Sequence, residues 1–203
     1  SIESKTRRII MLVPMRAILD AADKNGYAQG AFNVNAVCQV KAAVDVHQIL
    51  RSPAIIQGAD LANGFMGGRT DFANSTLEDK KAGAKNIGAA VKKYAADSDI
   101  PVALHLDHGK NFDSCIAAIE GGYTSVMIDG SSLPFDENVE LTREVVKYAH
   151  ERGVTVEGEL GVLAGVEDHV FAATSTYTNP LSAIDFFKKT GVDALAISYG
   201  TMH

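Results

Sequence analysis

The sequence predicts an α/β protein that forms part of a (β/α)8 barrel, and three features of the 203-residue chain lead to this prediction. Short apolar runs alternate with amphipathic segments of helical period, which is the pattern of repeated βα units. The apolar runs show no in/out alternation, as expected for parallel strands that are covered on both faces. Polar residues suited to ligand binding follow several runs, and the chemistry of barrel enzymes converges at the carboxyl ends of the strands.

The predicted order is one helix, then five βα units, then a sixth strand. The strands are six short apolar runs, at 31–35, 54–59, 102–107, 125–129, 155–160 and 194–199. The helices cover 15–24, 36–50, 78–94, 112–120, 136–152 and 180–190. An eight-fold barrel takes about 250 residues. Residues 1–203 are therefore expected to form a single incomplete barrel domain, with two βα units missing.

Local signals place the ends of these helices. Pro14 suits the first turn of a helix, and Asn25-Gly26 is a helix-stop signal. Glu78 and Asp79 put negative charge at the amino-terminal end of the helix 78–94, where the helix dipole favours it. The glycine-containing segment 61–78 holds few hydrophobic residues and is predicted to be a long loop, either a plain insertion or a lid or subunit contact.

Composition excludes several classes of protein. The net charge of −6 and the pI near 5.5 argue against a nucleic-acid partner. No apolar run approaches the roughly 20 residues of a membrane span, and no signal peptide is evident, so a cytoplasmic location without a membrane partner is expected. Cys38 and Cys115 lack a CxxC pattern and lie on predicted helices among apolar neighbours. Both are expected to be buried free thiols. No predicted strand is followed by the G-x-G-x-x-G turn of a dinucleotide-binding open sheet.

The strongest chemical signal is the sequence HLDHG at 105–109. The two-residue period of a strand sends His105 and Asp107 to one side, with leucines on the other. His108 falls at the turn after the strand, above the mouth of a barrel. Imidazole is the commonest metal ligand in proteins, so this strand end is a candidate metal site.

Two other strand ends carry ligand-type residues. Glu157 and Glu159 alternate along 155–160 and point to one side, where a cation stabilises paired carboxylates. Glu167 follows in a glycine-containing segment, and His203 follows the last strand after a Gly-Thr turn. His108, Glu159 and His203 would offer two nitrogens and an oxygen. This ligand set suits catalytic zinc, which keeps an open coordination position.

Five sequence landmarks in order resemble the zinc-dependent (class II) fructose-bisphosphate and tagatose-bisphosphate aldolases. They are GAFNVN at 30–35, HLDHG at 105–109, SVMIDGSSLPFDEN at 125–138, VEGELG with GVED at 156–168, and TGVDALAISYGTMH at 190–203. The resemblance runs from about Leu12 to His203 and implies the first three-quarters of such an enzyme. Residues 1–10 match nothing in the family and are interpreted as an added or unordered leader.

The resemblance implies a role for each candidate site residue. Four residues are implied metal ligands: His108, Glu159, His203 and Asp129. Two are implied to move protons: Asp107 at the substrate C4 hydroxyl, and Glu167 at the carbon that becomes nucleophilic. Three are implied to contact the substrate or its phosphate: Asn35, Gly200 and Thr201. The implied ions are zinc for catalysis, a second divalent ion, and sodium or potassium as a monovalent cation.

The sequence departs from the family at three places. A third zinc-binding histidine, in a His-Gly-Gly-Ser-Gly-like motif, is expected on the next strand, after this chain ends. The Asn-x-Asp-Thr-like phosphate-binding segment that follows it is absent too. Ala59 stands where much of the family has a serine after the second strand.

The implied activity is reversible aldol cleavage of fructose 1,6-bisphosphate to dihydroxyacetone phosphate and glyceraldehyde 3-phosphate, in glycolysis and gluconeogenesis, by a homodimer or homotetramer. The predicted strands carry no lysine, which disfavours a Schiff base and favours a metal ion as the electron sink. Tagatose 1,6-bisphosphate, the C4 epimer, is an alternative substrate. Two further interpretations stay open: an inactive barrel fragment that needs a C-terminal part or a partner chain, and a metal-free barrel that binds phosphorylated sugars.

Overall fold

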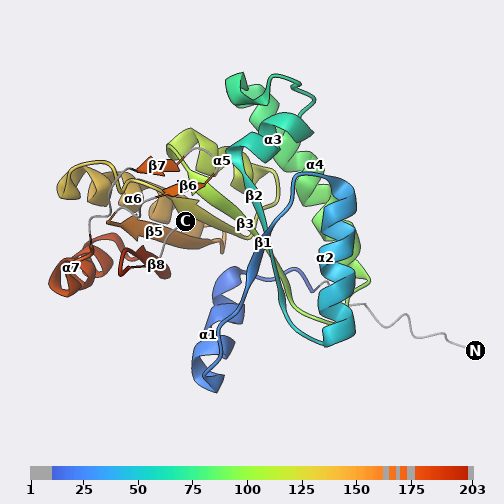
Figure 1. The fold of residues 1–203 in the computed structure, drawn as a ribbon, viewed down its shortest axis with the longest axis horizontal. Coiled ribbons are helices and arrows are strands. Elements are labelled where there is room, and N and C mark those ends of the chain that lie inside the picture. Colours follow the sequence, from blue (N-terminus) through green and yellow to red (C-terminus); the bar gives the residue numbers. More distant parts are fainter. Residues whose placement is uncertain (1–10, 162–164, 168–169, 173–176, 201–203) are drawn as a thin grey trace, which may run out of the picture.

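The computed structural model describes residues 11–161, 165–167, 170–172 and 177–200. Six parallel strands form one curled sheet in the order β1-β2-β3-β4-β5-β8 (Figure 1). Their bounds are β1 Ala31–Asn33, β2 Ala54–Ala59, β3 Val102–Gly109, β4 Ser125–Ile128, β5 Thr155–Leu160 and β8 Ala194–Ile197. This arrangement confirms the prediction of a partial (β/α)8 barrel.

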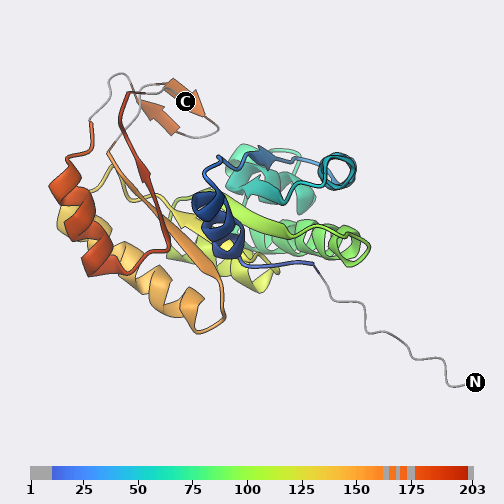
Figure 2. The same cartoon turned by 90° about the horizontal axis from the view of Figure 1, so that it is seen from below.

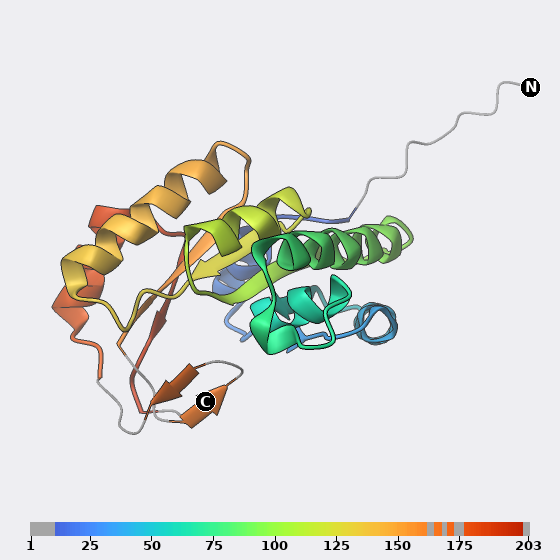
Figure 3. The same cartoon turned by 90° about the horizontal axis from the view of Figure 1, so that it is seen from above.

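Helices alternate with the strands and cover the outer face of the sheet. In the view of Figure 3, α4, α5 and α6 line this face one after another. The helices are α1 Met15–Asn25, α2 Val37–Leu50, α3 Asp60–Met66, α4 Leu77–Ala96, α5 Phe112–Glu120, α6 Phe135–His150 and α7 Pro180–Thr190, with a short 3₁₀ turn η1 at Phe72–Asn74. Among the described residues, no helix is both long enough and apolar enough to cross a membrane.

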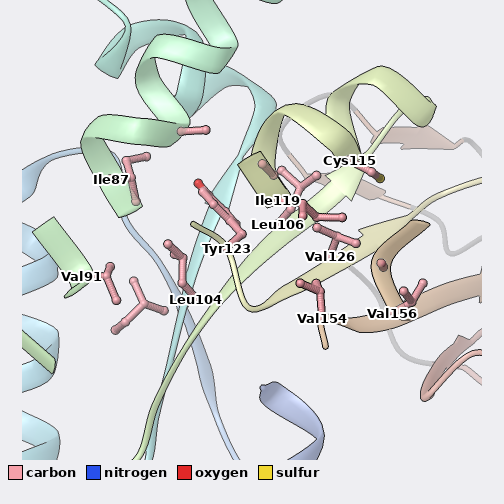
Figure 4. Packing of buried hydrophobic residues seen from close by; sticks show 14 of the residues in the cluster. Ile87, Val91, Leu104, Leu106, Cys115, Ile119, Tyr123, Val126, Val154 and Val156 are labelled. Atoms are coloured by element: carbon pink, nitrogen blue, oxygen red, sulfur yellow. The ribbon is translucent and has the colours of Figure 1, made fainter. Parts of the chain in front are cut away.

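The main core lies between the sheet and this helical layer. Leu104 and Leu106 of β3 are fully buried against Ile87 of α4 and Tyr123, which precedes β4 (Figure 4). Each fully buried aliphatic side chain contributes about 1.5–3 kcal/mol to folding. The leucines therefore face outward to the helices, as the two-residue period of the HLDHG strand predicts.

A second, smaller core fills the inner side of the curl. Met15 and Ile18 of α1 pack on Ile55 of β2 and Ala103 of β3. Figure 2 shows α1 between the two arms of the curled sheet. Because α1 is amphipathic and its buried face meets the early residues of the strands, it fills the end opposite to the polar strand ends.

The prediction of a long loop over 61–78 is wrong, because α3 and η1 occupy much of this segment. The sequence rule treats glycine as a loop residue, but here glycines permit close contact between helices. A Cβ atom added at Gly83 of α4 would lie 1.7 Å from the carbonyl oxygen of Asn63, and one at Gly67 would lie 2.0 Å from that of Asp79. The glycine spacing therefore reports the packing of α3 on α4.

Two other features differ from the prediction. Cys115 is buried as expected, but Cys38 is exposed, because the inward face of α2 is formed by Val40 and Val44. The strands β6 (Gly165–Glu167) and β7 (Val170–Ala172) form an unpredicted antiparallel hairpin. This hairpin is a separate two-stranded sheet, apart from the curled sheet in Figure 3.

Asp193 joins α1 to the chain segments that enter β5 and β8. Its Oδ1 atom accepts a hydrogen bond from Nη1 of Arg16 at 2.8 Å. Its Oδ2 atom accepts from the backbone N–H of Val156 at 2.8 Å and from Nε2 of His150 at 2.9 Å. Burial raises the pKa of Asp193, but these hydrogen bonds outweigh burial and hold the pKa below its usual value.

We expect Asp193→Asn to lower the free energy of unfolding by about 1–3 kcal/mol at pH 7, because a charged acceptor of several hydrogen bonds is lost. A carboxyl group whose pKa is lowered on folding stabilises the protein above its unfolded pKa, about 3.9, and loses this effect as the pH falls through its folded pKa. The difference between wild type and variant should therefore shrink below about pH 4.

Urea unfolding at pH 7 and pH 3 measures this difference. Asp185→Asn is the matched control, because Asp185 pairs with Lys189 of the same helix and both side chains are about half exposed. No measurable change is expected for such a pair. Equal losses of stability in the two variants would contradict the role given to Asp193.

Candidate metal centre

Side chains from three adjacent strand ends form one cluster at the carboxyl edge of the sheet. His108 belongs to β3, Asp129 directly follows β4, and Glu159 belongs to β5. One ligand atom from each residue lies within 4.8 Å of the other two. Parallel neighbouring strands end at the same edge of a sheet, which is why residues 51 positions apart in the sequence (159 − 108) meet here.

The backbone of β3 is kinked where it presents His108. The pairing of β3 with β4 shifts register between Leu106 and Gly109, and His108 has a φ of 45°. A non-glycine residue rarely adopts this left-handed conformation, and such strain concentrates at functional sites. A Cβ atom at Gly109 would lie 2.6 Å from the carbonyl oxygen of Met127, so the kink requires glycine there.

Short contacts join the imidazole to both acids. Nδ1 of His108 lies 2.9 Å from Oδ2 of Asp129 and 3.5 Å from Oε2 of Glu159. The other oxygen of Asp129 accepts hydrogen bonds from the backbone N–H and the hydroxyl of Ser131, at 3.1 and 2.6 Å. Oε2 of Glu159 is buried and has no hydrogen-bond partner among the described residues.

These surroundings shift the pKa of each group. Burial lowers the pKa of His108, but the hydrogen bond to Asp129 and the nearby carboxylates outweigh burial and raise it to about 9. Burial, together with the charge of Asp129, raises the pKa of Glu159 to about 8 despite the opposing charge of His108. Burial also raises the pKa of Asp129, but the hydrogen bonds from His108 and Ser131 prevail and lower it.

The donor set fits a divalent cation. A buried carboxylate oxygen without a hydrogen-bond partner is costly, and a cation beside it removes that cost. Imidazole nitrogen and carboxylate oxygen are ordinary zinc ligands. His108, Asp129 and Glu159 therefore form a candidate metal site. A bound ion would supply the partner that the buried Oε2 atom of Glu159 lacks.

Asp107 lies beside this cluster and is held by a residue to which the sequence assigned no role. Oδ1 of Asp107 is 4.0 Å from Nε2 of His108. Oδ2 of Asp107 accepts a hydrogen bond from Nδ2 of Asn33 at 3.0 Å. Asn33 ends β1, across β2 from Asp107, so its position was predictable only from the sheet order and curl.

Asn35 lies two residues past the end of β1. It lines a hollow of about 370 Å³ together with Leu61, Phe65 and Phe72. Its backbone N–H donates to Oε1 of Gln39 at 2.6 Å. Contact of Asn35 with substrate stays a prediction, and Asn33 is the asparagine that contacts the candidate acid.

The remaining predicted site residues are not brought into the cluster by the described part of the chain. Gly200 is described, with a φ of 116° that favours glycine. Glu167 lies in β6, but its side chain is outside the described residues. Thr201 and His203 lie outside the described residues altogether. The roles assigned to these four residues stay predictions.

A second polar pair, His105 and Glu157, lies two residues nearer the amino-terminal ends of β3 and β5. Nε2 of His105 is 3.2 Å from Oε2 of Glu157, and Nδ1 of His105 is 2.7 Å from Oγ of Ser125. His105 precedes Asp107 by two residues, as Glu157 precedes Glu159. Both pairs therefore occupy the inner face of the curl, as the alternation along each strand predicts.

A family model, described as "Fructose-bisphosphate aldolase class-II", matches residues 13–203. The chain is 48% identical over 196 residues to a fructose-bisphosphate aldolase of Treponema pallidum, covering 95% of this chain and 55% of that protein. It is 40% identical over 194 residues to a fructose-bisphosphate aldolase of Geobacillus stearothermophilus, covering 95% of this chain and 62% of that protein.

Solved structures give a consistent result. The YdjI aldolase from Escherichia coli K12 superposes with a TM-score of 0.74 at 30% identity, covering 95% of this chain and 62% of that one. A putative fructose-1,6-bisphosphate aldolase from Coccidioides immitis superposes with a TM-score of 0.76 at 26% identity, covering 98% and 63%. The chain thus spans 55–63% of the length of these four relatives.

Proposed function

Because the chain belongs to the class II fructose-bisphosphate aldolase family, we propose that it contributes to metal-dependent, reversible aldol cleavage of a ketose bisphosphate. The proposed substrate is fructose 1,6-bisphosphate, which yields dihydroxyacetone phosphate and glyceraldehyde 3-phosphate; tagatose 1,6-bisphosphate remains the alternative. The observation that carries the proposal is the buried cluster of His108, Asp129 and Glu159 beside Asp107. We also propose that the enzyme acts in the cytoplasm as a homodimer or homotetramer.

The cluster residues would hold the catalytic ion, which we propose to be zinc. His108 and Glu159 would be ligands, Asp129 would serve this ion or a second divalent ion, and His203 would be a further ligand. When bound, the ion supplies a Lewis acid for the ketone and hydroxyl oxygens of the substrate, which is worth several kcal/mol of the barrier. Gly200 and Thr201 would bind phosphate together with sodium or potassium.

Asp107 is placed to move the proton of the C4 hydroxyl. Its side chain is 9% exposed, and the hydrogen bond from Asn33 fixes one oxygen, so the other can reach a substrate hydroxyl. In cleavage, Asp107 takes the hydroxyl proton, the C3–C4 bond breaks, and its electron pair stays on the phosphate-bearing ketone half. Glu167 then delivers a proton to C3. In the synthetic direction each proton moves the opposite way.

One feature favours the interpretation in which activity needs further residues. Strand β1 is exposed along its length, and Phe32 within it is 51% exposed. Helix α7 also exposes three large apolar side chains, Leu181, Ile184 and Phe187. Bare apolar strand edges invite pairing with other chain segments, so light scattering is used to measure the mass of the zinc-loaded chain in solution alongside its activity.

Hydrogen exchange at C3 of dihydroxyacetone phosphate tests the proposal without the second substrate. The zinc-loaded chain in deuterated water is expected to exchange the C3 hydrogen, as followed by proton NMR. Glu167→Ala should slow exchange by about 10²–10⁴-fold, the usual effect of a general acid–base group. Zinc content, measured by elemental analysis, should stay near that of the wild type.

Asp168→Asn is the control for this test, because it changes the neighbouring acid in the same segment. Full exchange in Glu167→Ala would reject the role of Glu167 alone. A monomeric wild-type chain that retains zinc without exchange would support the interpretation as an inactive barrel fragment. A wild-type chain that neither binds zinc nor exchanges hydrogen would reject the proposed function.

A further inference from the structure

Asn138 of α6 lies behind the metal cluster and contacts both strand ends that carry its acids. The residue is 1% exposed. Its Nδ2 atom donates to the backbone carbonyl oxygen of Glu159 at 2.9 Å. Its Oδ1 atom accepts from the hydroxyl of Thr142, one turn along the helix, at 3.2 Å. Both ends of the amide group are therefore hydrogen-bonded, which fixes the orientation of the side chain.

The same amide group packs against the backbone that follows Asp129. A Cβ atom added at Gly130 would lie 2.3 Å from Oδ1 and 2.8 Å from Cγ of Asn138. Because Gly130 has no side chain, its backbone approaches the amide closely. Asn138 thus touches the main chain of Glu159 in β5 and that of Gly130, two residues past the end of β4.

These contacts lie one position past the last pairing between the two strands, although the backbone N–H of Asp129 still donates to the carbonyl oxygen of Gly109 in β3 at 3.0 Å. The pairing of β4 with β5 ends at Ile128 and Gly158. Asp129 and Glu159 are the next residues on each strand, one position past the last paired residues. Strand β5 continues to pair with β8 on its other side, but this pairing does not fix the distance from Glu159 to Asp129.

We propose that Asn138 is a positioning residue, which bridges the ends of β4 and β5 and thereby sets the separation of the Asp129 and Glu159 carboxylates at the metal centre. The proposal rests on the proposed function, because it needs the cluster to bind a metal ion. Groups that orient metal ligands from outside the coordination shell typically contribute 10–100-fold to metal affinity. Asn138 acts in this way through the backbone of the ligands, without touching ion or substrate.

Cobalt(II) binding is the test, because the ion reports both affinity and coordination geometry through its visible absorption. Asn138→Asp has the same shape but replaces the amide N–H donors with an acceptor that faces the carbonyl of Glu159. Asn138→Ala removes the bridge. Both variants are expected to bind cobalt at least tenfold more weakly than the wild type, with a shifted visible spectrum.

Two control variants separate positioning from a loss of stability. Val145→Ala removes buried core volume two turns further along α6 and leaves the hydrogen bonds of Asn138 in place. Val139→Ala opens the core beside Asn138 on the same helix, and it should lower the unfolding midpoint in urea. Neither control should change cobalt affinity by more than about twofold. A change of this size is clearly smaller than the tenfold loss expected for the Asn138 variants.

The outcomes distinguish this inference from the proposed function. Wild-type affinity and spectrum in Asn138→Asp would overturn the positioning role and leave the metal site intact, and so would an equal loss of affinity in Val139→Ala. A wild-type chain that binds no cobalt would overturn both proposals. Gly130→Ala presses on the same amide from the Asp129 side; if the Asn138 variants do not fold, its unchanged cobalt affinity would also overturn the bridge.

Discussion

Replacing His108 by alanine is expected to abolish tight zinc binding by this chain. His108 supplies the nitrogen closest to both acids of the cluster, with Nδ1 at 2.9 Å from Asp129 and 3.5 Å from Glu159. Loss of an outer-shell contact costs 10–100-fold in metal affinity, so loss of a ligand is expected to cost more than about 100-fold. The alanine also leaves Asp129 and Glu159 without the positive partner between them.

A zinc titration against a competing chelator, with elemental analysis of the purified variant, measures this loss. His47→Ala is the matched control, because His47 is also buried but contacts the carbonyl oxygen of Ala43 and the ring of Phe32. It should lose stability and keep zinc. Zinc affinity within tenfold of the wild type in His108→Ala would show that the cluster is not the metal site.

The fold was predictable to a large extent because local signals and global architecture agree. Strands β2 and β5 and helices α5 and α7 have the bounds that the sequence predicts. Strands β2, β3 and β4 are buried almost throughout, as runs without in/out alternation predict, and each helix ends at a glycine or polar break. The sequential strand order follows from the barrel architecture, which the polar residues at several strand ends favoured over a doubly wound sheet.

The errors arise where a residue type has two physical uses. The glycine-containing segment 61–78 was interpreted as a long loop, whereas its Gly67, together with Gly83 of α4, permits contacts at distances that no side chain allows. Cys38 was interpreted as buried because its neighbours are apolar, but only one face of α2 is covered. Each outcome depends on tertiary neighbours, which the chain sequence does not reveal locally.

Some residues of the candidate site were predictable from local sequence, and others depend on tertiary contacts. The HLDHG motif and the alternating glutamates indicated His108, Asp107 and Glu159 from local spacing alone. Asn33 and Asn138 act through hydrogen bonds that depend on the curl of the sheet and on the register of β4 with β5. Asn33 is visible in the sequence as a polar residue at a strand end, but no local signal identifies the partner of either asparagine, because asparagine has many uses at a strand end or in a first helical turn.

The raised pKa values explain how the chain tolerates a buried acid cluster without an ion. With the pKa of Glu159 at about 8 and that of His108 at about 9, both residues keep their protons at pH 7. With Glu159 neutral, the positive charge of His108 faces the carboxylate of Asp129, its hydrogen-bond partner. Protons occupy the electrostatic role that a divalent cation would otherwise take.

Metal affinity is therefore expected to rise steeply with pH. Both ligands must lose a proton to bind an ion, and each displaced proton contributes about tenfold in affinity per pH unit. Below the Glu159 pKa of about 8, two protons leave and affinity should rise about 100-fold per unit. Between that value and the His108 pKa of about 9 one proton leaves, and above it affinity should level off.

Calorimetric titration with cobalt at pH 6, 7 and 8, in buffers of different protonation enthalpy, gives the affinity and the number of protons released. About two protons are expected at pH 7. In Asp129→Asn the carboxylate that holds the His108 proton is gone, so fewer protons should be released, whatever the change in affinity. A constant affinity over this range, with no proton release, would mean that the metal-free ligands are already deprotonated. The orphaned oxygen of Glu159 would then be charged, and the buried cluster would depend on a bound cation even for folding.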